Sequence, residues 1–104
     1  MRRAEIWWAE LPQPAGERPV VVLTRNAVID TIGGVVVALV TRTNRGLPTE
    51  IAVGRQEGLP RPSVVNLDAI LTVPRQRLVR QMGQLSGSKV EELDRGLKVS
   101  LGLA

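Results

Sequence analysis

The sequence contains neither cysteine nor histidine among its 104 residues. Without cysteine there can be no disulfide, no thiol chemistry and no cysteine-based zinc site. Without histidine, Ser-His-Asp triads, paired-histidine nuclease sites and histidine metal sites are excluded. An enzyme made from this chain must therefore use arginine, carboxylates, hydroxyls, backbone dipoles or groups of its substrate.

Aromatic residues and long apolar runs are also scarce. Trp7 and Trp8 are the only aromatics, which argues against single-strand binding on stacked aromatic platforms. Because neighbouring strand residues face opposite sides, at most one of them could serve an SH3-like peptide groove. No run approaches the roughly 18–20 apolar residues of a membrane span, and Met1–Glu5 leads into no signal-peptide core. We expect a cytoplasmic protein without a membrane segment.

The charged residues are mostly arginine. The net charge is +4, and 12 of the 14 basic residues are Arg. Arginine binds phosphate bidentately and keeps its charge at any working pH, so the composition favours a phosphate-rich partner; a GC-rich genome would explain the choice of Arg over Lys equally well. The carboxylates form no close acidic cluster and no glycine-rich phosphate loop is present. Neither a metal nor a cofactor is expected.

The chain length fits one domain spanning 1–104, with a strand-rich part (1–74) and a helix-containing part (75–104). Strands are predicted at 6–11, 18–24, 35–41, 50–53, 63–66 and 70–73, separated by Pro- and Gly-containing turns. The apolar run Val20–Leu23 predicts burial on both faces. The predicted fold is mostly β with a C-terminal α-helix, as a small SH3-like barrel or strongly bent antiparallel sheet whose closure removes exposed edges.

The last thirty residues carry the helix. Residues 75–82 fit either a helical turn or an extended edge segment. Ser88 and Glu91 have the spacing of a capping box, and apolar residues then recur at helical spacing, namely Val90, Leu93, Leu97 and Leu101. Gly102 is the expected stop, and Gly96 inside the helix suggests a close contact.

Arg18 lies in Gly16-Glu17-Arg18-Pro19-Val20-Val21-Val22-Leu23, directly before the buried run. Alone, such a charge is usually just solvated, and a strand-end threonine such as Thr41 usually satisfies backbone groups. The ordered set of segments is more specific: Ile6-Trp7-Trp8-Ala9-Glu10-Leu11, the Arg-Pro strand, the strand ending in Thr41, Leu47-Pro48-Thr49-Glu50-Ile51, Ile70-Leu71-Thr72-Val73 and the terminal helix. Across nearly the whole chain this set resembles the MazF/PemK family, toxin endoribonucleases of type II toxin–antitoxin systems with a CcdB/PemK-like fold.

The resemblance implies a sequence-selective, metal-independent endoribonuclease that cuts single-stranded RNA by 2′-OH attack on the adjacent phosphate. Arg18 would stabilise the phosphorane charge and help protonate the leaving 5′-oxygen, and Thr41 would hydrogen-bond to the same phosphate. DNA lacks the 2′-OH and would not be cut. RNA-binding roles are expected for Gln13, Glu17, Arg42, Arg45 and Asp68. Of the basic loop residues Arg25, Arg42, Arg45, Arg55 and Arg61, we favour Arg42 and Arg45 because they follow Thr41.

The resemblance further implies a homodimer with RNA in a groove across it, and a cognate antitoxin whose acidic C-terminal tail occupies that groove. The RNA target could be mRNA, tRNA or rRNA. Two positions depart from the family pattern: Gln13 stands where the first loop has Glu, and Ala69 where a base-reading polar residue is usual. The alternative is a non-enzymatic gyrase-inhibiting toxin of the CcdB type, whose helix ends in Trp-Gly-Ile; here residues 101–104 contain no Trp.

Overall fold

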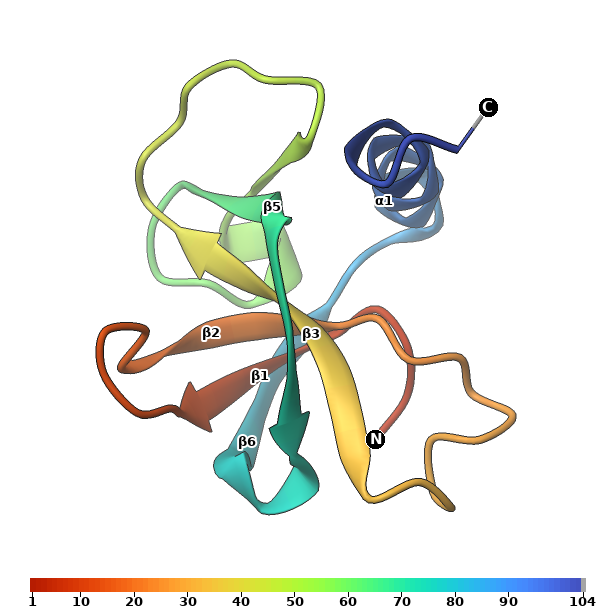
Figure 1. Ribbon diagram of the computed structural model, residues 1–104. Helices are drawn as coiled ribbons and strands as arrows, with labels where there is room; N and C mark the ends of the chain where they lie inside the picture. Colours follow the sequence, from red (N-terminus) through yellow and green to blue (C-terminus); the bar gives the residue numbers. More distant parts are fainter. Residues whose placement is uncertain (104) are drawn as a thin grey trace.

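The computed structural model describes residues 1–103; Ala104, the last residue of the predicted domain, lies outside the described residues. Six strands form one antiparallel sheet in the order β4-β5-β3-β2-β1-β6. The strands are β1 (Glu5–Glu10), β2 (Glu17–Val22), β3 (Gly34–Thr41), β4 (Glu50–Val53), β5 (Ser63–Pro74) and β6 (Leu78–Gln84). Helix α1 (Gly87–Ser100) packs on β4 and β5 (Figure 1). The mostly β fold with a C-terminal helix is confirmed.

The strongly bent antiparallel sheet is confirmed: it curls into a half-barrel whose edges are β4 and β6 (Figure 1). Within residues 1–103 these two strands do not pair with each other, so the sheet does not close into a full barrel. The 3₁₀ turn η1 (Arg55–Glu57) meets β6 instead. A Cβ on Gly83 would lie 2.0 Å from the Glu57 carbonyl oxygen, and one on Gly58 would lie 2.2 Å from the Met82 carbonyl oxygen. Only glycine permits so close an approach of two backbones, and this contact brings the segment after η1 against β6.

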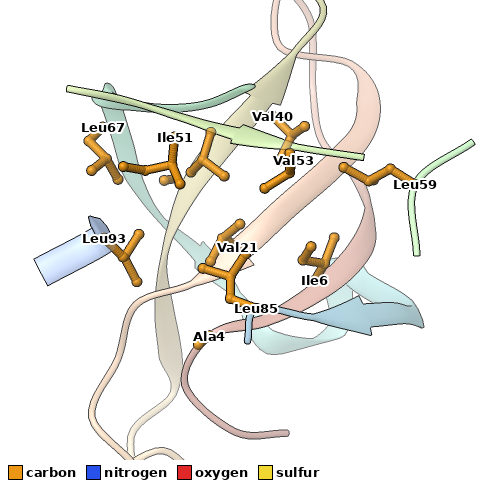
Figure 2. Packing of buried hydrophobic residues seen from close by; sticks show 12 residues of the cluster. Ala4, Ile6, Val21, Val40, Ile51, Val53, Leu59, Leu67, Leu85 and Leu93 are labelled. Carbon is orange, nitrogen blue, oxygen red and sulfur yellow. The ribbon is translucent and has the colours of Figure 1, made fainter. Parts of the chain in front are cut away.

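Two hydrophobic clusters lie on the two faces of the sheet. Val20, Val21 and Val22 are all fully buried because alternate residues point into different clusters. Val21 belongs to the cluster that includes Ile6 and Leu93 of the helix (Figure 2), and its two neighbours belong to the cluster around Ile29. Burial of β2 on both faces is therefore confirmed.

The predicted strands at 63–66 and 70–73 are one continuous strand, β5, and the prediction of a break is wrong. Leu39 pairs with Asn66 whereas Ala38 pairs with Ile70, so residues 67–69 form a bulge. The bulge is stable because its polar groups find other partners: the Leu67 N–H donates to the Thr49 carbonyl (2.9 Å) and the Leu67 carbonyl accepts from Ser100 Oγ (2.6 Å).

The predicted capping box at Ser88 is wrong, because the helix begins two residues earlier. Ser86, and not Ser88, is the N-cap, and its Oγ accepts from the Lys89 N–H at 3.4 Å. The stop at Gly102 is confirmed: with a φ of 69°, it closes a Schellman motif in which the Leu103 N–H reaches the Lys98 carbonyl at 2.7 Å. Gly96 has the close contact expected of it, since a Cβ there would lie 2.5 Å from Leu67 Cδ1. No helix within residues 1–103 is long and apolar enough to cross a membrane.

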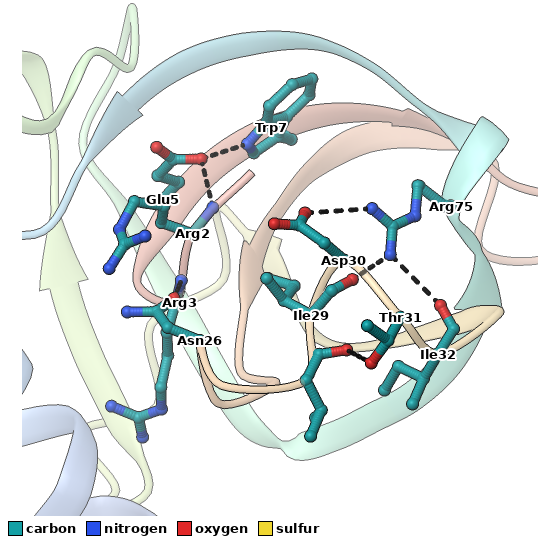
Figure 3. A network of polar contacts seen from close by, with 11 residues as sticks. Arg2, Arg3, Glu5, Trp7, Asn26, Ile29, Asp30, Thr31, Ile32 and Arg75 are labelled. Atoms are coloured by element: carbon teal, nitrogen blue, oxygen red, sulfur yellow. Dashed lines mark hydrogen bonds and ion pairs between the residues drawn. The ribbon is translucent and has the colours of Figure 1, made fainter.

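The segment after Pro74 was predicted as either a helical turn or an extended edge segment, and it contains both. A 3₁₀ turn, η2 (Arg75–Arg77), precedes β6, which is an edge strand on β1. Arg75 reaches back to the loop between β2 and β3, where its Nη2 donates to the carbonyls of Ile29 and Ile32 and its Nη1 pairs with Asp30 at 3.5 Å (Figure 3). This arginine anchors the loop at the end of β2 opposite Arg18.

Candidate active-site groove

Arg18 and Thr41 lie side by side at one end of the β2–β3 pair. Val20 pairs with Leu39, and continuing this antiparallel register by two residues puts Arg18 opposite Thr41. Both residues line two neighbouring hollows. We call the larger, of about 390 Å³, the Arg18 groove, and the smaller, of about 150 Å³, the Asn66 pocket.

The loop before β2 orients the Arg18 side chain. Its Nε donates to the Ala15 carbonyl at 2.8 Å, and Ala15 itself packs against the core cluster around Ile29. The loop closes on itself through bonds from Leu11 N–H to the Gly16 carbonyl (3.3 Å) and from Gly16 N–H to the Pro12 carbonyl (3.2 Å). Within residues 1–103 only Nε makes a hydrogen bond, so the two Nη groups of Arg18 keep their donors for an anion.

Thr41 is the last residue of β3, and its hydroxyl already takes part in one hydrogen bond. Its Oγ1 accepts from the Thr43 N–H at 3.3 Å. A hydroxyl that accepts one bond still has its own proton to donate. The Thr41 hydroxyl can therefore accept the backbone hydrogen bond and donate to a bound anion at the same time.

Positive charge prevails around both hollows. Arg42 and Arg61 line the Arg18 groove together with Glu17, and Arg45 lines the Asn66 pocket. The two favoured basic residues thus flank the Arg18–Thr41 pair, whereas Arg25 and Arg55 line other hollows. This balance suits a polyanion that runs past Arg18.

Two residues with expected RNA-binding roles do not line either hollow. The amide of Gln13 lies against Gly16, where a Cβ would be 3.2 Å from Gln13 Nε2. Asp68 is in the β5 bulge, and its Oδ2 accepts from Thr49 Oγ1 at 2.7 Å. RNA binding by either side chain stays a prediction, and it would involve contacts beyond the two hollows.

Other residues line the hollows although sequence reasoning did not select them. Trp8 and Met82 contribute apolar surface to the Arg18 groove, with the Arg80 guanidinium 5.9 Å from the centre of the Trp8 ring. Glu50 and Asn66 contribute polar groups to the Asn66 pocket. The sequence predicted a strand at 50–53, but only the register of β4 and β5 shows that Glu50 pairs with Asn66.

A metal site finds no support in the part of the chain that the structure describes, where no three carboxylate side chains come together in a group that could hold an ion. The Arg18–Thr41 pair itself can supply hydrogen-bond donors, and positive charge, to an anionic group.

A family model described as "PemK-like, MazF-like toxin of type II toxin-antitoxin system" matches residues 2–101. The chain belongs to this family. It is 45% identical over 103 residues to the probable endoribonuclease MazF2 of Mycobacterium tuberculosis, covering 98% of this chain and 99% of the relative.

Solved structures agree with this assignment. The Mycobacterium tuberculosis toxin MazF-mt6 superposes with a TM-score of 0.89 at 38% identity, covering 96% of this chain and 98% of the other. An endoribonuclease from a mycobacterial species, solved in complex with its cognate antitoxin, gives a TM-score of 0.89 at 26% identity, covering 100% and 97%. The comparisons favour the endoribonuclease over the gyrase-inhibiting alternative, because the family and these relatives are MazF-like.

Proposed function

We propose that the Arg18 groove is the RNA-cleaving site of this MazF-type endoribonuclease toxin, with Arg18 and Thr41 as its catalytic residues. The observation that carries the proposal is that Arg18, near the start of β2, and Thr41, the last residue of β3, both line the two hollows. One phosphate bound between them would meet the free Nη groups of Arg18 and the hydroxyl proton of Thr41.

The reaction uses the RNA as its own nucleophile. The 2′-OH gives up its proton to solvent and attacks the adjacent phosphorus, the bond from phosphorus to the 5′-oxygen breaks, and that oxygen takes up a proton from solvent. The products are a 2′,3′-cyclic phosphate and a 5′-hydroxyl end. In this proposal Arg18 stabilises the negative charge that develops on the phosphorane and donates a hydrogen bond to the leaving oxygen. Thr41 donates to a non-bridging oxygen.

Electrostatic stabilisation is the main catalytic contribution in this scheme. A well-placed donor to developing charge contributes roughly 3–4 kcal/mol. The absence of histidine from the chain is compatible with it, because the nucleophile comes from the substrate. Single-stranded RNA is the preferred substrate, since the bases and backbone of a stacked duplex resist in-line geometry.

The antitoxin and the quaternary state belong to the same proposal. A related endoribonuclease was solved with its cognate antitoxin, and the arginines around the groove complement an acidic tail that would block RNA. A homodimer and a cytoplasmic location complete the proposal. The proposed substrate is an unpaired segment of RNA, which mRNA, tRNA and rRNA can all supply.

Purified protein incubated with a mixed-sequence RNA tests the function. Cleavage is expected to continue in EDTA, to leave 5′-hydroxyl ends and to be absent on DNA of the same sequence. Loss of cleavage on chelation would contradict the metal-free scheme. Cleavage of DNA would contradict the role of the 2′-OH, and binding to DNA gyrase without RNA cleavage would favour the CcdB-type alternative.

A further inference from the structure

The floor of the Asn66 pocket is built from three adjacent strands, two of which contribute a polar side chain. Asn66 of β5 pairs with Glu50 of β4 on one side and with Leu39 of β3 on the other. Directly paired residues project to the same face, so these three side chains form a row across the sheet. Thr41 lies two residues further along β3, which corresponds to about 7 Å, and Arg18 lies opposite it. The row of side chains therefore lies next to the phosphate position proposed above.

Asn66 presents a hydrogen-bond donor to this pocket. Its Oδ1 accepts from the Asp68 N–H at 2.9 Å, inside the β5 bulge. This bond distinguishes the oxygen from the nitrogen of the amide. In the described part of the chain the Nδ2 group has no acceptor, so its two protons are available and Asn66 acts as a hydrogen-bond donor in the pocket.

Glu50 presents an acceptor beside it. Its Oε1 accepts from the Arg45 N–H and from the Leu47 N–H, both at 2.9 Å. These bonds hold the loop between β3 and β4 and fix the orientation of the carboxylate. Within residues 1–103 the structure gives Oε2 no donor, and this oxygen remains available as an acceptor in the pocket.

We propose that the Asn66 pocket selects the nucleobase next to the cut phosphate, and that it takes a base with an exocyclic amino group and disfavours uracil. The proposal rests on the RNA-cleaving function proposed above. An amino group donates to Glu50 Oε2, as glutamate accepts from the cytosine amino group in nucleic-acid complexes, while the neighbouring ring acceptor takes the Asn66 Nδ2 donor. Uracil can make the same two bonds only through its ring N3–H, which lies between two carbonyl oxygens. One of these oxygens takes the Asn66 donor, and the other is left beside the negatively charged carboxylate, whereas the amino group of cytosine has a C–H on that side.

Cut-site sequencing on a randomised RNA library tests this with the wild-type protein and two variants. Glu50→Gln keeps the Oε1 acceptor for the loop and replaces Oε2 with a donor. Asn66→Asp keeps the Oδ1 acceptor for Asp68 and replaces the donor with an acceptor. Glu91→Gln, on an exposed face of α1, is the matched control.

For the wild-type protein and the control, we expect uracil to be disfavoured about tenfold at one of the two positions that flank the cut. Glu50→Gln should remove this bias while cleavage continues, and Asn66→Asp should change the preferred base at the same position. Equal use of all four bases by the wild type, or an unchanged bias in a folded and active Glu50→Gln, would overturn the inference and leave the cleavage function intact. A wild type that cuts no RNA would overturn both.

A substrate-side measurement needs no variant. An RNA whose flanking cytosine is replaced by 2-pyrimidinone lacks only the amino group. Wild-type cleavage of this RNA should be about tenfold slower than that of the parent, and an equal rate would contradict the assignment of Glu50 Oε2 as the acceptor.

Discussion

The two ends of the β2–β3 pair differ sharply although they share one buried middle. At one end, Arg18 and Thr41 open onto two hollows bordered by arginines. At the other, Leu23 and Val36 border an apolar hollow of about 410 Å³ completed by residues of the loop and helix, including Ile32 and Leu101. The three valines between the ends are fully buried. The strands thus hold a charged site rigidly at one end while the other end serves packing and anchoring.

The largest expected effect is at the charged end. Arg18→Ala should lower kcat about 10²–10³-fold, because it removes a donor to the charge that develops on the phosphorane. The free energy of unfolding should fall by no more than about 1 kcal/mol, since the lost bond to the Ala15 carbonyl is a single half-exposed one. Single-turnover cleavage and urea denaturation measure the two quantities. Arg77→Ala, at an exposed arginine of η2, is the control, and equal losses in both variants would contradict the special role of Arg18.

Arg75→Ala should give the opposite pattern at the apolar end. It removes the donors to the carbonyls of Ile29 and Ile32, and we expect the free energy of unfolding to fall by about 1–2 kcal/mol. Cleavage per folded molecule should stay unchanged, because Arg75 lines neither hollow near Thr41. A thermal melt combined with an activity assay below the transition tests this, and a loss of kcat in fully folded protein would show that the two ends are not independent.

A smaller effect is expected from Thr41→Val, which keeps the shape of the side chain and removes its hydroxyl. Loss of one hydrogen bond to an anionic oxygen costs about 1.5 kcal/mol, or roughly tenfold in rate. The loss should appear in kcat/KM with the same RNA. Thr43→Val provides the comparison, because Thr43 lines both hollows next to Thr41. We expect Thr43→Val to lower kcat/KM less than Thr41→Val does. An inactive Thr43→Val with an active Thr41→Val would reverse the assignment.

The smallest expected effect concerns the flanking arginines. Arg42→Ala and Arg45→Ala should each weaken RNA binding and lower the slope of log affinity against log salt by about 0.7, the amount for one phosphate contact on a single strand. Fluorescence anisotropy with a non-cleavable RNA at several salt concentrations measures the slope. Arg55→Ala, which lies at another hollow, should leave it unchanged, and an equal drop in all three variants would indicate long-range charge in place of contacts.

Much of the sheet was predictable because its apolar runs are short and bounded by prolines and glycines. β4 has the predicted bounds Glu50–Val53, and the valines of β2 are buried as predicted. The bulge in β5 was not predictable, because the polar residues Asn66 and Asp68 resemble a break between strands. The helix start was misplaced because Ser86 and Ser88 are both good caps, and burial of Leu85, which positions the chain, is a tertiary effect.

The candidate site was predictable to a similar extent. Arg18 and Thr41 came from the family resemblance, and the register brings them together. Glu50 and Asn66 could not be joined from the sequence, because their pairing depends on where the bulge falls. The RNA-binding roles of Gln13 and Asp68 were expected from the family resemblance, and the sequence gives no sign that Gln13 lies against Gly16 or that Asp68 bonds to Thr49.

Cleavage of an RNA carrying a single 2′-deoxynucleotide tests the central claim most directly. The substitution is placed on the 5′ side of a mapped cut and leaves the charge, the bases and every other sugar unchanged. The account predicts that cutting at that bond stops in the wild-type protein while neighbouring sites are still cut to 2′,3′-cyclic phosphate ends. Cutting at the deoxy position at the normal rate would contradict attack by the 2′-OH at the Arg18–Thr41 pair.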